Sequence, residues 1–560
     1  MFAAPGTSAI ERSAACARCH PSEAAAWSTS QHAGACRAFD ASGDSALLDP
    51  SLSAASEEGL RPAGVIGIAP LRQVIVAAPG GRLQIFDPAF DPARGERFSI
   101  FGAEARRPGD WGHWRGRGMN FNSQCAACHM TDLRKGYDPA SDTYATSWTA
   151  AGIACAGCHG DMPNHERDPR ADSGSLALRA RPMDVCGACH SRREELVSDP
   201  PPQGAFDDRY RLFLADEPGL YAADGRAEDE DFELGSLLSS PMGQAGVTCL
   251  DCHDPHSGRL RASVDDDALC LGCHRAPGRR GAVSVDPASH SHHPPASAGA
   301  RCVACHMPER VYMARDPRRD HAFSIPDPLL SKEIGATDTC ATCHSDRPAG
   351  WTEAQVDRWY GDRMERPSRR RARAVLRARA MDRAVEPELL AVARSEPNVT
   401  WRAALIGLLG PLAAEEGSRS FLRQALSDPD ARVRTAAIRA LARFPDERPL
   451  LVPLREDPVR LARLFASWAT RATLSADPAA LREVEAWLRI ASDQPAGAVR
   501  RSELSLVLGD ASSAVDWARR AVAWDPSPPS YFTLARALSA AGETREAREA
   551  AEKGRAAFPP

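Results

Sequence analysis

Apolar residues follow a helical pattern throughout the carboxy-terminal part of this 560-residue chain, from about Trp351 onward. Ala, Leu and Arg dominate there, and neither cysteine nor histidine occurs after that position. In residues 427–441 an Asp-Pro pair precedes apolar residues at helical spacing, which is typical of a HEAT-type repeat. The pattern predicts HEAT-like helical repeats over residues 351–500.

A second repeat follows at the end of the chain. Three of its positions recur 33 residues later, with Gly509, Ala514 and Ala518 matching Gly542, Ala547 and Ala551. This offset predicts tetratricopeptide-like repeats over residues 501–560. Residues 351–560 are therefore expected to form an α-solenoid, an architecture that usually offers a concave binding surface. A structural cap on the preceding part is an equally weighted alternative.

The first 350 residues contain one clear β pattern. Residues 74–76 and 83–86 are mostly β-branched or apolar, and Pro79-Gly80-Gly81 between them marks a turn, so the pattern predicts a β-hairpin. The rest of this part is expected to form short helices and loops. No run of 18 apolar residues occurs, so no transmembrane span is expected.

The cysteines and histidines are the residues that indicate the chemistry of this chain, which contains 17 cysteines and 16 histidines. Sixteen of the cysteines form eight Cys-x-x-Cys pairs, each followed directly by histidine, and only Cys36 is left over. In chain order, these motifs are site 1 (Cys16, Cys19, His20), site 2 (Cys125, Cys128, His129), site 3 (Cys155, Cys158, His159), site 4 (Cys186, Cys189, His190), site 5 (Cys249, Cys252, His253), site 6 (Cys270, Cys273, His274), site 7 (Cys302, Cys305, His306) and site 8 (Cys340, Cys343, His344).

Cys-x-x-Cys-His is the attachment signature of haem c. The two thiols bond to one haem, and the adjacent histidine is the proximal ligand of its iron. Paired cysteines can also bind zinc, but a zinc site does not require histidine after every second cysteine. A disulfide framework does not have this regularity either. The motifs therefore predict eight covalently attached haems c.

The eight remaining histidines are candidates for the second, distal ligand of the irons, because all of them lie in the haem-binding part. They are His32, His113, His165, His256, His290, His292, His293 and His321. The three between 290 and 293 are so close in sequence that only one, or at most two, is expected to reach an iron. About six distal histidines are thus expected for eight haems. The other sites would have water, no ligand, or a methionine from the set Met119, Met130, Met242 and Met307.

Eight haems also constrain the fold. With roughly 44 residues per motif, the first 350 residues cannot build an ordinary side-chain core, so porphyrin faces must supply apolar surface. The predicted fold class is mainly α. An octahaem cytochrome domain (residues 1–350) of short helices and loops around packed haems, with one small β-hairpin, precedes the solenoid.

The net charge of the chain and the compartment in which haem c is attached restrict which molecules this protein can have as partners. A net charge of −5 and a pI near 6.4 argue against nucleic-acid binding. The first residues show no secretory leader. Haem c is nevertheless attached outside the cytoplasmic membrane in bacteria, so we expect an exported protein, periplasmic or extracellular, whose leader precedes the sequence given. The expected partners are redox proteins, with docking through the solenoid as one option.

Several segments resemble a known family. They are Trp27 to His32, Gly246 to Thr248 before site 5, Asp254 to Ser257 after it, His306 to Pro308, and Arg318 to Phe323. The chain resembles exported multihaem cytochromes with doubled CxxCH motifs, of the cytochrome c-552/4 type, that carry HEAT and tetratricopeptide repeats and are distantly akin to hydroxylamine oxidoreductase. The resemblance implies that His32, His165, His256, His293 and His321 are distal ligands, and less directly His113.

Two functions are compatible with these motifs. The first is electron transfer along closely spaced haems, because a haem with two histidine ligands mostly passes electrons. The alternative is a reductase or oxidase of a small nitrogen or sulfur oxyanion at one haem with an open distal face. Arg115, Arg117, Arg192 and Arg193 would be candidate oxyanion contacts, or ion-pair partners of haem propionates. No catalytic acid or base is assigned. We expect electron transfer.

Overall fold

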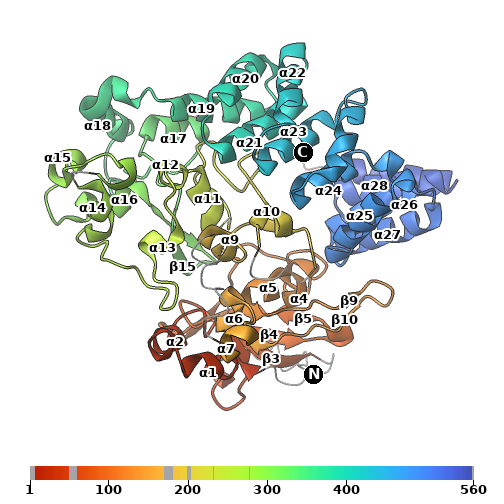
Figure 1. The fold of residues 1–560 in the computed structure, drawn as a ribbon, viewed down its shortest axis with the longest axis horizontal. Coiled ribbons are helices and arrows are strands. Elements are labelled where there is room, and N and C mark those ends of the chain that lie inside the picture. The colour runs from red at the N-terminus through yellow and green to blue at the C-terminus, as the bar shows by residue number, and fades with distance from the viewer. Residues whose placement is uncertain are drawn as a thin grey trace.

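A computed structural model describes residues 7–48, 60–168, 181–198, 204–230, 232–275 and 278–557. The opening six residues, which show no leader, lie outside this part. The fold class predicted from the sequence is confirmed: short helices with a few small strands are followed by a long run of helices (Figure 1). In Figure 1 these later helices run from α18 (Trp351–Tyr360) along the top to α28 (Pro528–Ala540) at the right. No described helix is long and apolar enough to cross a membrane.

The predicted hairpin is present, and it belongs to a larger sheet. Strands β4 (Gln73–Ala77) and β5 (Leu83–Ile85) pair antiparallel around the turn at 79–81. Strands β2 (Cys36–Ala38) and β3 (Arg61–Ile66) extend the sheet in the order β2-β3-β4-β5. The sequence did not indicate these two strands, because one has only three residues and the other contains Pro62 and Gly64, where the pairing register shifts.

The two faces of this sheet pack against different groups. On one face Ile66, Ile75 and Ile85 join Ala126 and Met130 around site 2. The other face contributes Val65, Val74, Val76 and Phe86 to a separate cluster. Side chains alternate along a strand, so the single row β2 to β5 forms a wall of site 2 with one face and a small apolar core with the other.

Most of the motifs lie on very short helices. These include α5 (Ala126–His129), α6 (Cys155–His159), α13 (Cys249–Cys252), α14 (Ala268–His274) and α16 (Cys302–His306). Helices of four to seven residues do not persist alone in water, because nucleation costs more than so few hydrogen bonds return. Their conformation depends on what they contact.

The later helices, in contrast, have an ordinary apolar core. Helix α23 (Ala431–Leu441) is capped by Asp430, whose carboxylate accepts a hydrogen bond from the Arg432 amide. Val433 and Ile438 of this helix are fully buried, together with Leu405 of α21 (Val399–Leu409). Farther along, α28 and α29 (Thr544–Ala556) begin 33 residues after α26 (Pro495–Val507) and α27 (Ala511–Trp524). This matches the sequence offset, and the tetratricopeptide assignment stays a prediction.

One apolar cluster joins the two parts of the chain. Leu212, Tyr221 and Leu234 of the first part belong to the same buried cluster as Leu405 and Leu409 of the solenoid. At its edge the Trp401 indole donates a hydrogen bond to the Ser239 carbonyl, at 3.1 Å. The solenoid is therefore built onto the haem-binding part rather than attached by a linker.

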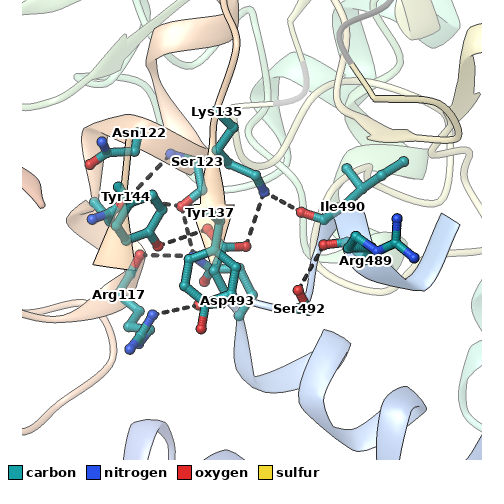
Figure 2. A network of polar contacts seen from close by, with 12 residues as sticks. Arg117, Asn122, Ser123, Lys135, Tyr137, Tyr144, Arg489, Ile490, Ser492 and Asp493 are labelled. Carbon is teal, nitrogen blue, oxygen red and sulfur yellow. Dashed lines mark hydrogen bonds and ion pairs between the residues drawn. The ribbon is translucent and has the colours of Figure 1, made fainter. Parts of the chain in front are cut away.

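A polar network joins the parts a second time, far along the solenoid (Figure 2). The carboxylate of Asp493, which is fully buried, accepts hydrogen bonds from Lys135 Nζ at 3.0 Å and from the Tyr144 hydroxyl at 2.8 Å. The Arg117 guanidinium donates to the Asp493 carbonyl at 3.0 Å and lies 3.8 Å from the ring centre of Trp524. Burial and the Asp493 carboxylate raise the pKa of Tyr144, so this phenol stays protonated as a donor.

We predict that Asp493→Asn destabilises the holoprotein. The substitution keeps the size of the side chain but removes the charge, which leaves the Lys135 ammonium unpaired in a mostly buried position. Removing one partner of a buried ion pair typically costs about 3 kcal/mol. The expected results are a lower melting temperature by calorimetry and faster proteolysis within residues 495–556.

A matched control is Glu549→Gln. Glu549 pairs with Arg545 at 2.7 Å on an exposed helix surface, and such pairs contribute less than about 0.5 kcal/mol. An Asp493→Asn variant that melts at the same temperature as the Glu549→Gln variant would show that the buried network does not hold the solenoid in place.

Candidate haem sites

All eight motifs border one internal cavity. Its volume is about 3820 Å³, and at least one cysteine of every motif lines it. An ordinary ligand pocket measures roughly 300–1,000 Å³, so this cavity is several times larger. No disulfide joins any of the 17 cysteines, all of which lie in the described residues. The thiols of the motifs are therefore available for another covalent partner along the same cavity.

Six of the motif histidines lie opposite a histidine from outside the motifs. The distance between the two ring centres is between 6.0 and 6.5 Å in every pair. The pairs are His20 with His165, His190 with His32, His159 with His256, His253 with His321, His306 with His290, and His344 with His293.

This spacing fits an iron between two imidazoles. Two metal–nitrogen bonds of roughly 2 Å, plus roughly 1 Å from each nitrogen to its ring centre, give about 6 Å. Ring contacts in general spread over about 4.5–7 Å, whereas these six pairs fall in one narrow range and each combines a motif histidine with a non-motif one. The residues present therefore fit haem c. When bound, haem supplies an iron that alternates between Fe³⁺ and Fe²⁺, and the chain supplies the thiols and imidazoles that hold it.

The structure brings together most of the histidines that the sequence singled out. His32, His165, His256, His293 and His321 each lie opposite a motif histidine. The number of pairs equals the expected six, and that these histidines bind iron stays a prediction.

The sixth partner differs from the expectation, because His290 takes the place given to His113. The ring of His113 lies 5.9 Å from Trp114, its Nδ1 accepts a hydrogen bond from the Arg115 amide, and it faces no motif histidine among the described residues. His290 and His293 both lie opposite motif histidines, while His292 stacks on Trp359 with 4.5 Å between ring centres.

The backbone explains this division of the 290–293 cluster. Helix α15 (Pro287–Ser291) ends at His292, which has a positive φ of 54°. The reversal separates His290, on the last turn of the helix, from His293, beyond it. Sequence spacing alone does not reveal such a turn, because few non-glycine residues have a positive φ.

Sites 2 and 6 have no imidazole opposite the motif histidine among the described residues. Nδ1 of His129 donates a hydrogen bond to the Ala35 carbonyl oxygen, 3.1 Å away. Nδ1 of His274 donates one to the Val283 carbonyl oxygen, 3.0 Å away. These bonds fix the tautomer and leave Nε2 for a metal. Of the four candidate methionines, all of which line the cavity, Met130 is packed in the apolar cluster beside site 2 with only 3% of its surface exposed.

The ring nitrogens of other histidines are held in the same way, mostly by neutral groups. His293, His306 and His321 each place Nδ1 within 2.6–2.9 Å of a backbone carbonyl oxygen, those of Ser291, Ser324 and Arg319. His190 has a different partner, since its Nδ1 lies 3.1 Å from Oε2 of Glu233.

The pairs also connect the sites in space, because neighbouring histidines in the sequence serve different sites. The segment from His20 to His32 links site 1 to site 4, and that from His159 to His165 links site 3 to site 1. Equivalent segments link site 5 to site 3 (253–256), site 7 to site 5 (306–321) and site 7 to site 8 (290–293). The result is a continuous series, 4-1-3-5-7-8.

Cysteine contacts place the two remaining sites beside this series. The Cys128 thiol of site 2 lies 3.8 Å from the Cys189 carbonyl of site 4. The Cys302 amide of site 7 donates a hydrogen bond to the carboxylate of Asp267, the residue that precedes α14 of site 6, at 2.9 Å. Site 2 thus branches from the series at site 4, and site 6 branches from it at site 7.

The candidate arginines are engaged in different ways. Arg117 belongs to the network with Asp493, and Arg193 donates to the Ala188 carbonyl and stacks on Tyr210 at 4.0 Å. Arg115 lies over the Trp114 ring at 4.9 Å, and Arg192 lines the cavity. Arg115, Arg117 and Arg193 therefore already have structural partners.

Cys36 lies in the sheet, away from any motif in the sequence. Only 2% of its surface is exposed, and it packs with Ile66 and Ile75. Burial raises the pKa of its thiol to about 12, so the reactive thiolate does not form at neutral pH.

Three families match parts of the chain. The cytochrome c554 and c-prime family matches residues 15–58 and 114–160, which include sites 1 to 3. The doubled CXXCH motif matches residues 241–278, with sites 5 and 6, and HEAT repeats match residues 386–470. Together with the cavity and the histidine pairs, these matches define the class: the chain is a multihaem c-type cytochrome with HEAT repeats in its carboxy-terminal part.

One curated relative is similar to part of the chain. The multiheme cytochrome MtrA of Shewanella baltica is 23% identical over 177 residues, which cover 27% of this chain and 51% of the relative. The chain thus spans about half the length of the curated relative that it matches. No solved structure matches.

We predict that His290→Ala converts one haem from low spin to high spin, because its iron loses the second imidazole. Low-temperature EPR of the oxidised protein measures this change. His292→Ala, two residues away and stacked on Trp359, is the control and should leave the spectrum unchanged. The reverse result would assign the ligand to His292 instead.

We further predict one titratable thiol per chain. With sixteen cysteines bonded to haem, only Cys36 reacts with a thiol reagent. The reaction should be slow in the folded protein, because the thiol is buried and protonated, and fast in denaturant. More than one reactive thiol after unfolding would mean that some motifs lack haem.

Proposed function

We propose that this chain carries electrons through eight covalently bound haems c, one at each motif, between redox partner proteins. The observation that carries the proposal is the set of six imidazole pairs along one continuous cavity. A haem with two imidazole ligands passes electrons with little change at the iron. Histidines only three to fifteen residues apart serve neighbouring sites, so successive haems would lie close together.

The role of each residue follows from its place. The sixteen motif cysteines would attach the haems, the eight motif histidines would be the proximal ligands, and His32, His165, His256, His290, His293 and His321 the distal ones. Because His129 and His274 have no imidazole opposite them among the described residues, sites 2 and 6 would have a different ligand state. An exported location is proposed on the same ground as the haems, since haem c is attached outside the cytoplasm.

The contacts support a structural role for the solenoid in this function. Its first helices share an apolar cluster with the haem-binding part, and Asp493 forms a second contact through its hydrogen bond with Lys135. Removal of residues 351–560 would expose Leu212, Tyr221 and Leu234, so the function is best tested on the full chain.

The test is haem quantification together with a reductive titration of the purified protein. We expect eight haems per chain by mass spectrometry and eight electrons taken up in reversible steps. EPR should resolve six low-spin haems of the bis-histidine type and two haems of another kind. A chain with fewer haems, or with reduction that is not reversible, would contradict electron transfer along the whole series.

A further inference from the structure

The Nδ1 nitrogen of His190, which points away from the expected iron, faces a carboxylate. Other histidines described above donate this hydrogen bond to backbone carbonyl oxygens. Oε2 of Glu233 lies 3.1 Å from Nδ1 of His190, and both side chains line the cavity. The corresponding bonds of His129, His274 and His306 end on neutral backbone oxygens. A carboxylate acceptor makes an imidazole a stronger donor to iron than a carbonyl acceptor does.

The backbone holds this carboxylate in place. Glu233 is the first residue of α11 (Glu233–Ser239), and the next amide, that of Leu234, donates to the His190 carbonyl at 3.0 Å. Leu234 also packs so closely on Gly187 of motif 4 that a side chain at Gly187 would collide with it. The main chain and the side chain of the same segment therefore both contact motif 4.

The charge of Glu233 is not taken up by the nearest arginine. Arg318 lies in its vicinity but already forms ion pairs with Glu230 at 2.9 Å and with Asp316 at 2.6 Å. Its other titratable neighbours are Cys249 and the paired imidazoles of His253 and His321. His190 is thus the partner that the Glu233 carboxylate contacts directly.

Site 4 occupies a junction among the sites. It touches site 2 through the Cys128 thiol and the Cys189 carbonyl, and helix α9 (Pro182–Cys186) of site 4 packs against α13 of site 5. His32, which lies opposite His190, comes from the segment of site 1. Site 4 therefore lies beside sites 1, 2 and 5, although it is the end of the series of paired histidines.

We propose that Glu233 is a positioning residue that lowers the reduction potential of the haem at site 4. The inference rests on the proposed function, because it concerns a haem held by His190. A negative charge at Nδ1 of His190 stabilises Fe³⁺ relative to Fe²⁺ by Coulomb attraction and by stronger donation from the imidazole. One electron reduces this iron and leaves it for a neighbouring one, and no bond forms or breaks. The lowered potential would make an electron at site 4 less stable than it would be without the charge of Glu233.

The experiment is a redox titration of the holoprotein, followed by absorbance and by EPR of samples poised at each potential. In Glu233→Gln the amide oxygen still accepts the N–H of His190 while the charge is lost. One midpoint potential should move to a more positive value, and the others should stay. His32→Ala assigns that midpoint, because the low-spin signal that it removes belongs to site 4.

Glu230→Gln is the matched control, since it removes the same charge from a neighbouring cavity residue that contacts Arg318 and not an imidazole. It should leave the site 4 midpoint in place. Unchanged midpoints in Glu233→Gln, or an equal shift in Glu230→Gln, would overturn the inference while leaving the eight-electron titration, and with it the proposed function, intact. If Glu233→Gln loses the haem of site 4, Glu233→Asp serves instead. Its shorter carboxylate should give a smaller positive shift of the same midpoint, and no shift would overturn the inference.

Discussion

The first 350 residues depend on the pairing of histidines from segments that are far apart in sequence. The α-helices among their described residues are only four to nine residues long, and the buried apolar clusters among them are small compared with the one that extends into the solenoid. His20 lies opposite His165 and His32 lies opposite His190, so each pair closes a long loop of chain. Closure of a long loop is entropically unfavourable, and the bonds that two imidazoles can make to one iron are strong enough to offset that cost. The arrangement of the sites follows from these pairs.

The solenoid adds a constraint of another kind. It contacts the haem-binding part at two separate places, with an apolar cluster around Leu405 and a buried charge at Asp493. A surface that is used for internal packing is not available to a partner. Of the two roles that the sequence left open, a concave binding surface and a structural cap, these contacts favour the cap.

Much of the molecule could be predicted from local sequence. The Cys-x-x-Cys-His motifs, the hairpin at 74–86 and the helical character after 351 depend on residues that are close together in the chain. What the sequence did not show depends on distant residues or on backbone turns. Nothing near Lys135 indicates that its partner is Asp493, more than 350 residues away. The exchange of His113 for His290 depends on a left-handed residue at His292, and strands β2 and β3 are too short or too irregular to give a pattern.

The order in which paired histidines occur along the chain divides the sites by the moment at which each could be completed as the chain emerges outside the cytoplasm. His32, His290 and His293 precede the motifs that they face, so both imidazoles of sites 4, 7 and 8 are present as soon as the motif emerges. His165, His256 and His321 follow theirs, by as much as 145 residues for site 1. A haem attached to Cys16 and Cys19, as proposed, would therefore keep one face uncovered until the segment after site 3 has emerged. The amino-terminal end of the protein is begun first and completed late.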